Sequence, residues 1–265
     1  MNQANHAGLA ENLVERSLPE SPRRPGTLLV FPAPLPYADT WALQRRLHAE
    51  RIADLRPDIL LLLEHEPIYT MGRTTQPTHW SGNEHLLREL GVTLQTVDRG
   101  GSITYHGPGQ LIGYPIMKLS GLSPGPKTYV RMLEQMLIDV LAFWGIDGHR
   151  VEKKPGIWVR TDGAGAKLAS IGVRLDCGVT MHGFALNIDL DLSPFSHIAP
   201  CGLDGCRMTS MAEVRQQSVD AKLVAQQIAR CFADTFNIDW REPLSYDMRT
   251  ETIDCPILAA AISPT

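Results

Sequence analysis

The sequence predicts an α+β (α/β) fold, in which a single domain is built on a mixed, largely antiparallel sheet packed by helices. Two long segments, near residues 127–144 and 218–236, carry apolar side chains at the helical period. Between them the period changes to two, which is typical of half-buried strands. Because strands and helices do not alternate regularly along the chain, an all-parallel sheet is not expected.

Each remaining element follows from a local pattern of apolar residues and breakers. Residues 58–64 contain an unbroken run of Ile and Leu, which fits a strand covered on both faces. Apolar residues occupy every second position over 171–175 and over 184–190, which predicts two strands joined by a hairpin turn at 176–178. The other expected elements are a strand over 27–31, a helix over 38–55, and a short helix over 83–90 that Asn83 caps and Gly91 ends.

The composition is that of an ordinary globular protein. The chain has 265 residues, of which 43% are hydrophobic and 20% charged, and its formal net charge is −4. This negative charge argues against wholesale binding to nucleic acid or to an anionic membrane surface, because such binding needs an excess of basic residues. A local basic patch remains open. We expect a flexible leader over residues 1–26, one domain over 27–240 and a C-terminal appendage over 241–265.

The cellular compartment is predicted from the cysteines and from the apolar runs. No uninterrupted apolar stretch approaches the roughly 20 residues that cross a bilayer, and the first residues do not resemble a signal peptide. Five cysteines is an odd number, which rules out a complete intramolecular disulfide framework and favours a reducing compartment. We therefore expect a cytoplasmic protein.

A polar, glycine-rich segment extends over residues 98–110, with four glycines in thirteen positions. Glycine is conformationally costly unless the backbone needs unusual dihedral angles or a ligand must approach closely. The segment therefore predicts either a tight turn between strands or a loop that cradles a substrate. Arg99, Ser102 and His106 would supply polar groups to such a loop.

Lys167 belongs to a predicted strand and shares its parity with Ala169 and Ile171. A lysine on an apolar face would be partly desolvated, which would lower its pKa and make it a possible base. A solvated lysine at a strand end is the commoner situation, and spacing alone does not decide between the two.

Cys201 lies between Pro200, which restricts the backbone, and Gly202, which we expect to leave room for a substrate. A thiolate attacks acyl carbonyls when a nearby cation or a helix N-terminus lowers the pKa of the thiol. Ser210 and Glu213 fit a capping box, so a helix is expected close behind. The alternative is a small buried cysteine without chemistry.

Two weaker signals do not support a function. Residues 121–125 match a serine nucleophile elbow, but Pro124 has no N–H to serve as the oxyanion donor that this elbow needs. A metal site at Cys201 and Cys206 would have an unusual spacing and no clear fourth ligand, so we expect no metal.

Together the motifs resemble those of the octanoyl (lipoyl) transferase family, the lipoate-protein ligase B type. The matching segments, in the order found in that family, are residues 64–73, 99–110, 167–172, 182–188, 200–202 and 209–211. The resemblance covers about residues 28–236. It implies an α/β catalytic fold shared with lipoate and biotin ligases.

The resemblance also implies an acyltransferase activity and its partners. Members of the family move an octanoyl group from acyl carrier protein to a lysine on lipoyl domains, in protein lipoylation and lipoate biosynthesis. The expected acceptors are the acyltransferase subunits of 2-oxoacid dehydrogenases and the glycine cleavage H protein. No cofactor is implied, neither ATP nor a metal, because the donor brings the acyl group as a phosphopantetheine thioester.

The family's functional residues map onto this chain one by one. The nucleophile maps to Cys201, and the lysine that lowers its pKa and assists proton transfer maps to Lys167. The implied substrate contacts are Arg99, Gly100, Gly101, Ser102, Ile103, Thr104, Tyr105, His106, Ser170, Ile171, Gly172, Gly183, Phe184 and Ala185.

The chemistry of these residues predicts a covalent mechanism. The Cys201 thiolate would attack the donor thioester, form an acyl-enzyme and pass the acyl group to the acceptor lysine. Backbone amides near Gly202 are candidates for the oxyanion hole. An apolar tunnel would select the chain length, and a basic docking surface for acyl carrier protein would draw on Lys118, Lys127, Arg131, Arg150, Lys153 and Lys154.

Three alternatives remain open at this point. An ATP-dependent lipoate or biotin ligase of the same fold explains the glycine-rich loop and the lysine, but it gives no role to Cys201. A catalytically silent module could bind acyl carrier protein or lipoyl domains. A cysteine hydrolase could use His106, His182 or His197 as its base.

Overall fold

A computed structural model describes residues 22–80, 92–120, 125–161, 164–202, 205–241, 244–247 and 252–254. For Ala164, Cys201 and residues 244–247 and 252–254 it describes the backbone alone. The helix expected over 83–90 and most of the predicted leader and appendage lie outside these residues.

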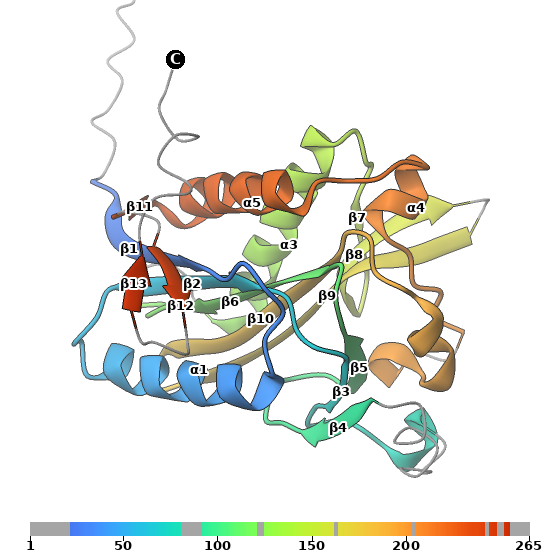
Figure 1. The fold of residues 1–265 in the computed structure, drawn as a ribbon, viewed down its shortest axis with the longest axis horizontal. Helices are drawn as coiled ribbons and strands as arrows, with labels where there is room; N and C mark the ends of the chain where they lie inside the picture. The colour runs from blue at the N-terminus through green and yellow to red at the C-terminus, as the bar shows by residue number, and fades with distance from the viewer. Residues whose placement is uncertain are drawn as a thin grey trace, which may run out of the picture.

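A mixed sheet forms the centre of the described chain (Figure 1). Its strand order is β13-β12-β1-β2-β6-β10-β9-β8-β7, and β11 also pairs with β1. The strands are β1 Arg24–Val30, β2 Asp58–Leu63, β6 Gln110–Ile116, β7 His149–Val151, β8 Lys154–Thr161, β9 Ala164–Asp176, β10 Val179–Asn187, β11 Ile238–Trp240, β12 Leu244–Asp247 and β13 Thr252–Asp254. Strand β1 pairs in parallel with β2, β11 and β12, whereas every pair from β2 to β7 is antiparallel. The predicted mixed, largely antiparallel sheet is therefore confirmed.

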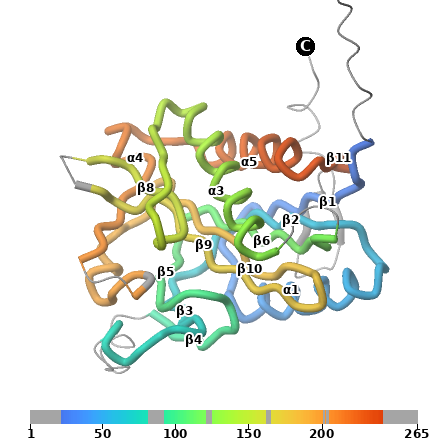
Figure 2. The backbone as a smooth tube through the Cα atoms, turned by 180° about the vertical axis from the view of Figure 1, so that it is seen from behind, coloured from blue at the N-terminus to red at the C-terminus, as the bar shows by residue number. Residues whose placement is uncertain are grey.

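Helices cover both faces of this sheet. They are α1 Tyr37–Ile52, α3 Pro126–Phe143, α4 Met211–Arg215 and α5 Ala221–Phe236. Helices α3 and α5 lie on one face and α1 lies on the other, in the front view and from behind (Figures 1 and 2). Strand β2 explains this arrangement, because Leu60 and Leu62 join the core cluster of α3 and α5, while Leu61 and Leu63 join that of α1. The strand is buried along its whole length, as its apolar run predicted.

A second, small sheet has the order β4-β3-β5. Its strands are β3 Ile68–Met71, β4 Thr93–Thr96 and β5 Ile103–His106. It lies at the end of the molecule away from β1 and β11 (Figures 1 and 2). Three short 3₁₀ helices complete the described elements: η1 Pro77–His79, η2 Ser193–His197 and η3 Pro200–Gly202.

Most of the local predictions agree with these elements. The expected hairpin joins β9 to β10, and its turn places Cys177 at φ 48° and Gly178 at φ 75°, as a tight turn between twisted strands requires. The Ser210 side chain caps α4 by accepting a hydrogen bond from the N–H of Glu213 at 3.1 Å. Two boundaries differ: β1 begins at Arg24, and β10 ends at Asn187, because the next two N–H groups bond to the carbonyl of Gly109 instead.

Among the described helices, none is long and apolar enough to cross a bilayer.

Candidate active site

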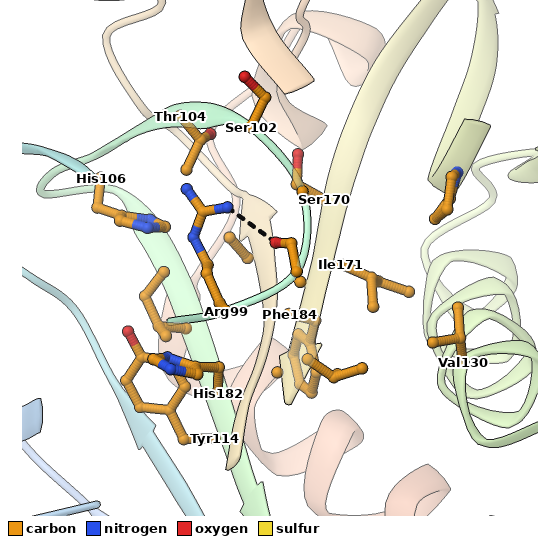
Figure 3. A pocket seen from close by; sticks show the side chains of 18 of the residues that line it. Arg99, Ser102, Thr104, His106, Tyr114, Val130, Ser170, Ile171, His182 and Phe184 are labelled. Carbon is orange, nitrogen blue, oxygen red and sulfur yellow. Dashed lines mark hydrogen bonds between the residues drawn. The ribbon is translucent and has the colours of Figure 1, made fainter. Parts of the chain in front are cut away.

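A cavity of about 280 Å³ lies where the loop before β5 meets β9 and β10 (Figure 3). Its lining consists of Tyr37, Arg99, Gly100, Gly101, Ser102, Thr104, His106, Ile112, Tyr114, Val130, Lys153, Lys154, Pro155, Lys167, Ser170, Ile171, Gly172, Val173, His182, Gly183, Phe184 and Ala185. The structure thus brings the glycine-rich loop, the predicted lysine strand and the 182–185 segment to one place. That convergence favours the substrate-cradling loop over the simple turn.

Strand β5 and the residue before it point alternate side chains toward the cavity and toward the core. Ser102, Thr104 and His106 line the cavity, whereas Ile103 and Tyr105 do not. Successive side chains of a strand point to opposite faces. Ile103 and Tyr105 therefore lie in an apolar cluster with Tyr69, Leu190, Phe195, Ile198 and Met208. Their predicted role as substrate contacts does not agree with this placement.

Arg99 holds the glycine-rich loop in its shape. The residue is 8% exposed, and its guanidinium donates to the Thr70 carbonyl at 2.7 Å, to the Thr70 hydroxyl at 2.9 Å and to the Gly100 carbonyl at 3.0 Å. The loop also packs tightly on β9, since a Cβ added at Gly172 would meet the Gly100 carbonyl oxygen at 2.9 Å. The glycines are therefore needed for close approach of two backbones.

Lys167 is buried in the wall of the cavity. Its residue is 2% exposed, and its Nζ lies 5.5 Å from the centre of the Trp158 ring. The alternative of a solvated lysine at a strand end is therefore wrong. Lys167 has a backbone neighbour on each side, which contributes to its burial. It pairs with Trp158 of β8 on one side and with Met208, in the segment after the Cys201 turn, on the other.

The backbone of Cys201 lies beside this cavity. Helix η3, which contains it, packs against β5, and a Cβ added at Gly202 would approach the Cβ of Ser102 to 3.3 Å. The Cys201 side chain lies outside the described atoms, so its pairing with the Lys167 amine stays a prediction. Lys167 lines the pocket, and the backbone of the Cys201 turn lies against Ser102, which lines the pocket too.

The expectation that Gly202 leaves room for a substrate is wrong. The space beside its Cα is filled by the His79 ring and Ser102 rather than left for a substrate. Its φ of +68° supplies a second reason for glycine. Its N–H donates to the Ala199 carbonyl at 2.9 Å, so this one amide is engaged in the turn, while an oxyanion hole made by other amides near Gly202 stays a prediction.

A hydrogen-bonded group that the sequence did not predict joins Asp98 and Arg174 to His182, which lines the cavity. The Nε2 of His182 lies 2.6 Å from Oδ1 of Asp98, and Arg174 contacts the other carboxylate oxygen. The hydrogen bond from His182 is the largest cause that lowers the pKa of Asp98 to about 2, while burial lowers the pKa of His182. Because the Asp98 carboxylate can only accept, the Nε2 of His182 carries a proton.

Buried rings form the polar end of the cavity. His65 Nε2 lies 2.8 Å from the Tyr114 hydroxyl, and Tyr37 stacks on His106 with ring centres 6.2 Å apart. Burial lowers the pKa of His65 to about 4 and that of His106 well below its usual range. Tyr37 and Tyr114 come from α1 and β6 and carried no motif, so sequence spacing could not have found them.

The predicted basic surface divides into separate places. Lys153 and Lys154 line the cavity, whereas Lys118 pairs with Asp54 at 2.5 Å and Arg150 pairs with Glu134 at 3.2 Å. Within the described residues, no group of three His, Cys, Asp or Glu side chains is placed to hold a metal ion.

Known proteins with similar sequences share this architecture. Residues 36–233 match the family model described as the lipoyl protein ligase A/B catalytic domain. An octanoyltransferase of Thermobifida fusca is 46% identical over 194 residues, which are 71% of this chain and 78% of that protein. An octanoyltransferase of Gloeobacter violaceus is 42% identical over 212 residues, or 80% of this chain and 90% of that protein.

Solved structures show the same fold at lower identity. A bi-partite lipoate protein ligase from Thermoplasma acidophilum superposes with a TM-score of 0.62 at 16% identity, covering 86% of this chain and 89% of that one. A lipoate-protein ligase A bound with ATP gives a TM-score of 0.61 at 18% identity, covering 86% and 91%.

The fold is that of solved lipoate protein ligases, and the catalytic-domain family model matches most of the chain. The chain belongs to the lipoyl protein ligase A/B catalytic domain family. Its sequence relatives are acyltransferases of the octanoyltransferase kind, so the predicted family, fold and enzyme class are confirmed.

Proposed function

We propose that this enzyme transfers an octanoyl group from acyl carrier protein to the lysine of a lipoyl domain, with Cys201 as the temporary acyl carrier and Lys167 as the proton-transfer group. The observation that carries the proposal is Lys167, 2% exposed in the cavity wall, with its backbone paired to the segment that follows the Cys201 turn. The octanoyltransferase relatives, which cover most of the chain, support the acyl group named here.

The first step exchanges one thioester for another. The Cys201 sulfur attacks the donor carbonyl carbon, a new S–C bond forms, and the bond to the pantetheine sulfur breaks. The Lys167 ammonium gives its proton to the leaving pantetheine thiolate. The exchange of thioesters is nearly balanced in free energy, and for this reason no ATP is required.

The second step makes an amide. The amine nitrogen of the acceptor lysine attacks the carbonyl carbon of the acyl-enzyme, and the S–C bond to Cys201 breaks. Lys167, neutral after the first step, takes the proton that the attacking nitrogen loses. The enzyme returns to its starting state with a Cys201 thiolate and a Lys167 ammonium.

The cavity offers an apolar path for an acyl chain beside these groups. Ile171 and Val130 lie on one side and Phe184 lies below, while His106 and Arg99 face them from the other side (Figure 3). Each buried methylene contributes about 0.8 kcal/mol, so the depth of the apolar part sets the preferred chain length.

The partners follow from the surface and from one structural neighbour. That neighbour is a lipoate protein ligase studied with its E2 lipoyl domain, which supports a lipoyl domain as acceptor. Lys153 and Lys154 stand at the cavity and offer positive charge to an acidic acyl carrier protein. We retain a reducing cytoplasm as the site of action and no metal as cofactor.

A reconstituted reaction tests the proposal. The enzyme is mixed with octanoyl-acyl carrier protein and a lipoyl domain without ATP, and the intact mass of the domain is followed. We expect the domain to gain one octanoyl group. Modification that needs both ATP and free octanoate would favour the ligase alternative, and release of octanoate without an acceptor would favour a hydrolase.

A further inference from the structure

His79 touches the Cys201 turn although it belongs to none of the motifs recognised in the sequence. A Cβ built on Gly202 would meet Cε1 of the His79 ring at 2.9 Å and Nε2 at 3.3 Å. The main chain of the same histidine also holds the turn, because its carbonyl accepts a hydrogen bond from the N–H of Ala199 at 2.6 Å. One residue therefore contacts the turn on both sides of Cys201.

The hydrogen bonds of the ring fix its proton. The backbone N–H of Gln76 donates to Nδ1 of His79 at 3.1 Å. A backbone N–H can only donate, so Nδ1 must be the acceptor and the proton of the neutral ring resides on Nε2. Ser102 Oγ lies 2.5 Å from the same Nδ1 and donates to it. Ser102 lines the cavity (Figure 3), so the His79 ring connects a residue of the cavity lining to the turn.

The orientation of the His79 ring brings its Nε2–H donor to the turn that contains Cys201. The Cε1–Nε2 edge faces η3, and the residue before Gly202 in that turn is Cys201. The amide of Gly202 is already bonded to Ala199, so the turn itself offers no N–H at that point. A thiolate in this position gains from a hydrogen-bond donor whose tautomer is fixed in advance.

The geometry points to His79 as a positioning residue of the transfer site: it clamps the Pro200–Gly202 turn, and its Nε2–H, on the ring edge that faces this turn, is the donor that stabilises Cys201 as the thiolate. This inference rests on the proposed role of Cys201 as nucleophile. It adds a third member to the pair of Cys201 and Lys167, and it gives the Gln76–His79 hydrogen bond the role of setting the tautomer.

Two substitutions separate the donor from the clamp. His79→Asn keeps a short side chain with an acceptor near the Nδ1 position, but it removes the Nε2–H. His79→Gln reaches the Nε2 position with an amide N–H. His197→Asn is the matched control, because His197 is an exposed histidine on η2, close to the turn in sequence.

The test measures the thiolate directly in the full chain. Alkylation of Cys201 by iodoacetamide is followed from pH 5 to 10 by peptide mass spectrometry, and acylation from octanoyl-acyl carrier protein is followed in single turnovers. A hydrogen bond to a charged group is worth roughly 1.5–3 kcal/mol. We therefore expect His79→Asn to raise the midpoint of alkylation by about one to two pH units and to slow acylation about 10- to 100-fold.

The control variants decide between the outcomes. His79→Gln should lie closer to the wild type than to His79→Asn, and His197→Asn should match the wild type. A His79→Asn protein with unchanged alkylation would overturn the proposal, as would equal losses in both His79 variants, which would indicate a clamp alone. Alkylation needs no acyl donor, so it tests the role of His79 even if the wild type is never octanoylated. Failure of the wild type to become octanoylated would contradict the proposed function and not the role of His79.

Discussion

The carbonyl oxygen of Lys167 accepts a hydrogen bond from the backbone N–H of Thr209 at 3.0 Å. The N–H of Lys167 donates in turn to the Arg207 carbonyl at 2.8 Å. A buried chain of amides secures the same point, since Gln110 donates to Asn187 and Asn187 donates to the Thr209 carbonyl, at 2.8 and 2.9 Å. The segment that returns from the Cys201 turn is thereby fixed to the strand that carries the lysine.

Removal of the Lys167 amine should stop proton transfer without unfolding the protein. Lys167→Met keeps the stem packed beside Trp158 and removes the group that gives and takes the proton. General acid–base groups contribute about 10²- to 10⁴-fold, and we expect a loss of that size in the transfer rate. Lys222→Met, at an exposed position of α5, is the control. Near wild-type turnover in Lys167→Met would remove the assignment.

A larger side chain at Ile171 should shorten the acyl chain that the enzyme prefers. Ile171→Phe fills part of the cavity on the side where Val130 also lies (Figure 3). If the space for about two methylenes is lost, octanoyl should lose roughly 1.6 kcal/mol, or about 15-fold in kcat/KM, relative to a shorter chain. The matched control is Leu175→Phe, on the same strand but exposed and outside the cavity. An unchanged ranking of acyl carrier protein thioesters by length would place the acyl chain elsewhere.

Reversal of charge at the cavity mouth should affect only the large donor. Lys153 is 89% exposed and lines the cavity, so Lys153→Glu should weaken the approach of an acidic carrier. We expect kcat/KM for octanoyl-acyl carrier protein to fall up to about 10-fold at low salt, and less at high salt. The value for octanoyl-pantetheine should not change, nor should that of a Lys222→Glu control. An equal loss with both donors would show that the effect is not docking.

Stability should fall as the pH drops below neutral. Burial lowers the pKa of His65 from 6.5 to about 4, so the unfolded chain takes up a proton first when the pH falls through 6.5. The stability that neutral His65 provides is complete above that value and is lost progressively down to pH 4. From pH 7 to 5 the free energy of unfolding should decrease by about 2 kcal/mol from this residue alone.

Urea unfolding of a His65→Asn variant checks this prediction. Asn can still donate to the Leu35 carbonyl that lies 3.0 Å from Nδ1, but it does not titrate in this range. Its stability should therefore depend less on pH than that of the wild type. Some dependence should remain, because the pKa values of His106 and His182 are lowered as well. An equal slope in both proteins would contradict the assignment to His65.

The sequence predicted those parts of the site that depend on local pattern. Period-two alternation predicted β9 and placed Lys167 on its apolar side, and the Ile and Leu run predicted a doubly covered strand. The motif order predicted which segments converge. The family resemblance assigned Ile103 and Tyr105 to the substrate because they lie within a contiguous motif. In a strand, however, only every second side chain points to the same face, and these two point to the core.

The residues that escaped prediction are joined by tertiary contacts alone. Asp98 and His182 are 84 positions apart, and His79 meets Ser102 and Gly202 only after η1 and η3 fold onto β5. The role given to Gly202 was wrong for the same reason, since the side chain that fills its space comes from a distant segment. The spacing of residues along the sequence carries no information about such contacts.

The central claim is that the octanoyl group resides on the sulfur of Cys201 during the reaction. The most direct measurement is the intact mass of the enzyme after brief incubation with octanoyl-acyl carrier protein, followed by peptide mapping. The wild type should gain one octanoyl group on Cys201 and lose it when a lipoyl domain is added, and Cys201→Ala should gain none. An octanoyl group on the Cys201→Ala protein, or transfer to the lipoyl domain by that variant at the wild-type rate, would contradict the account.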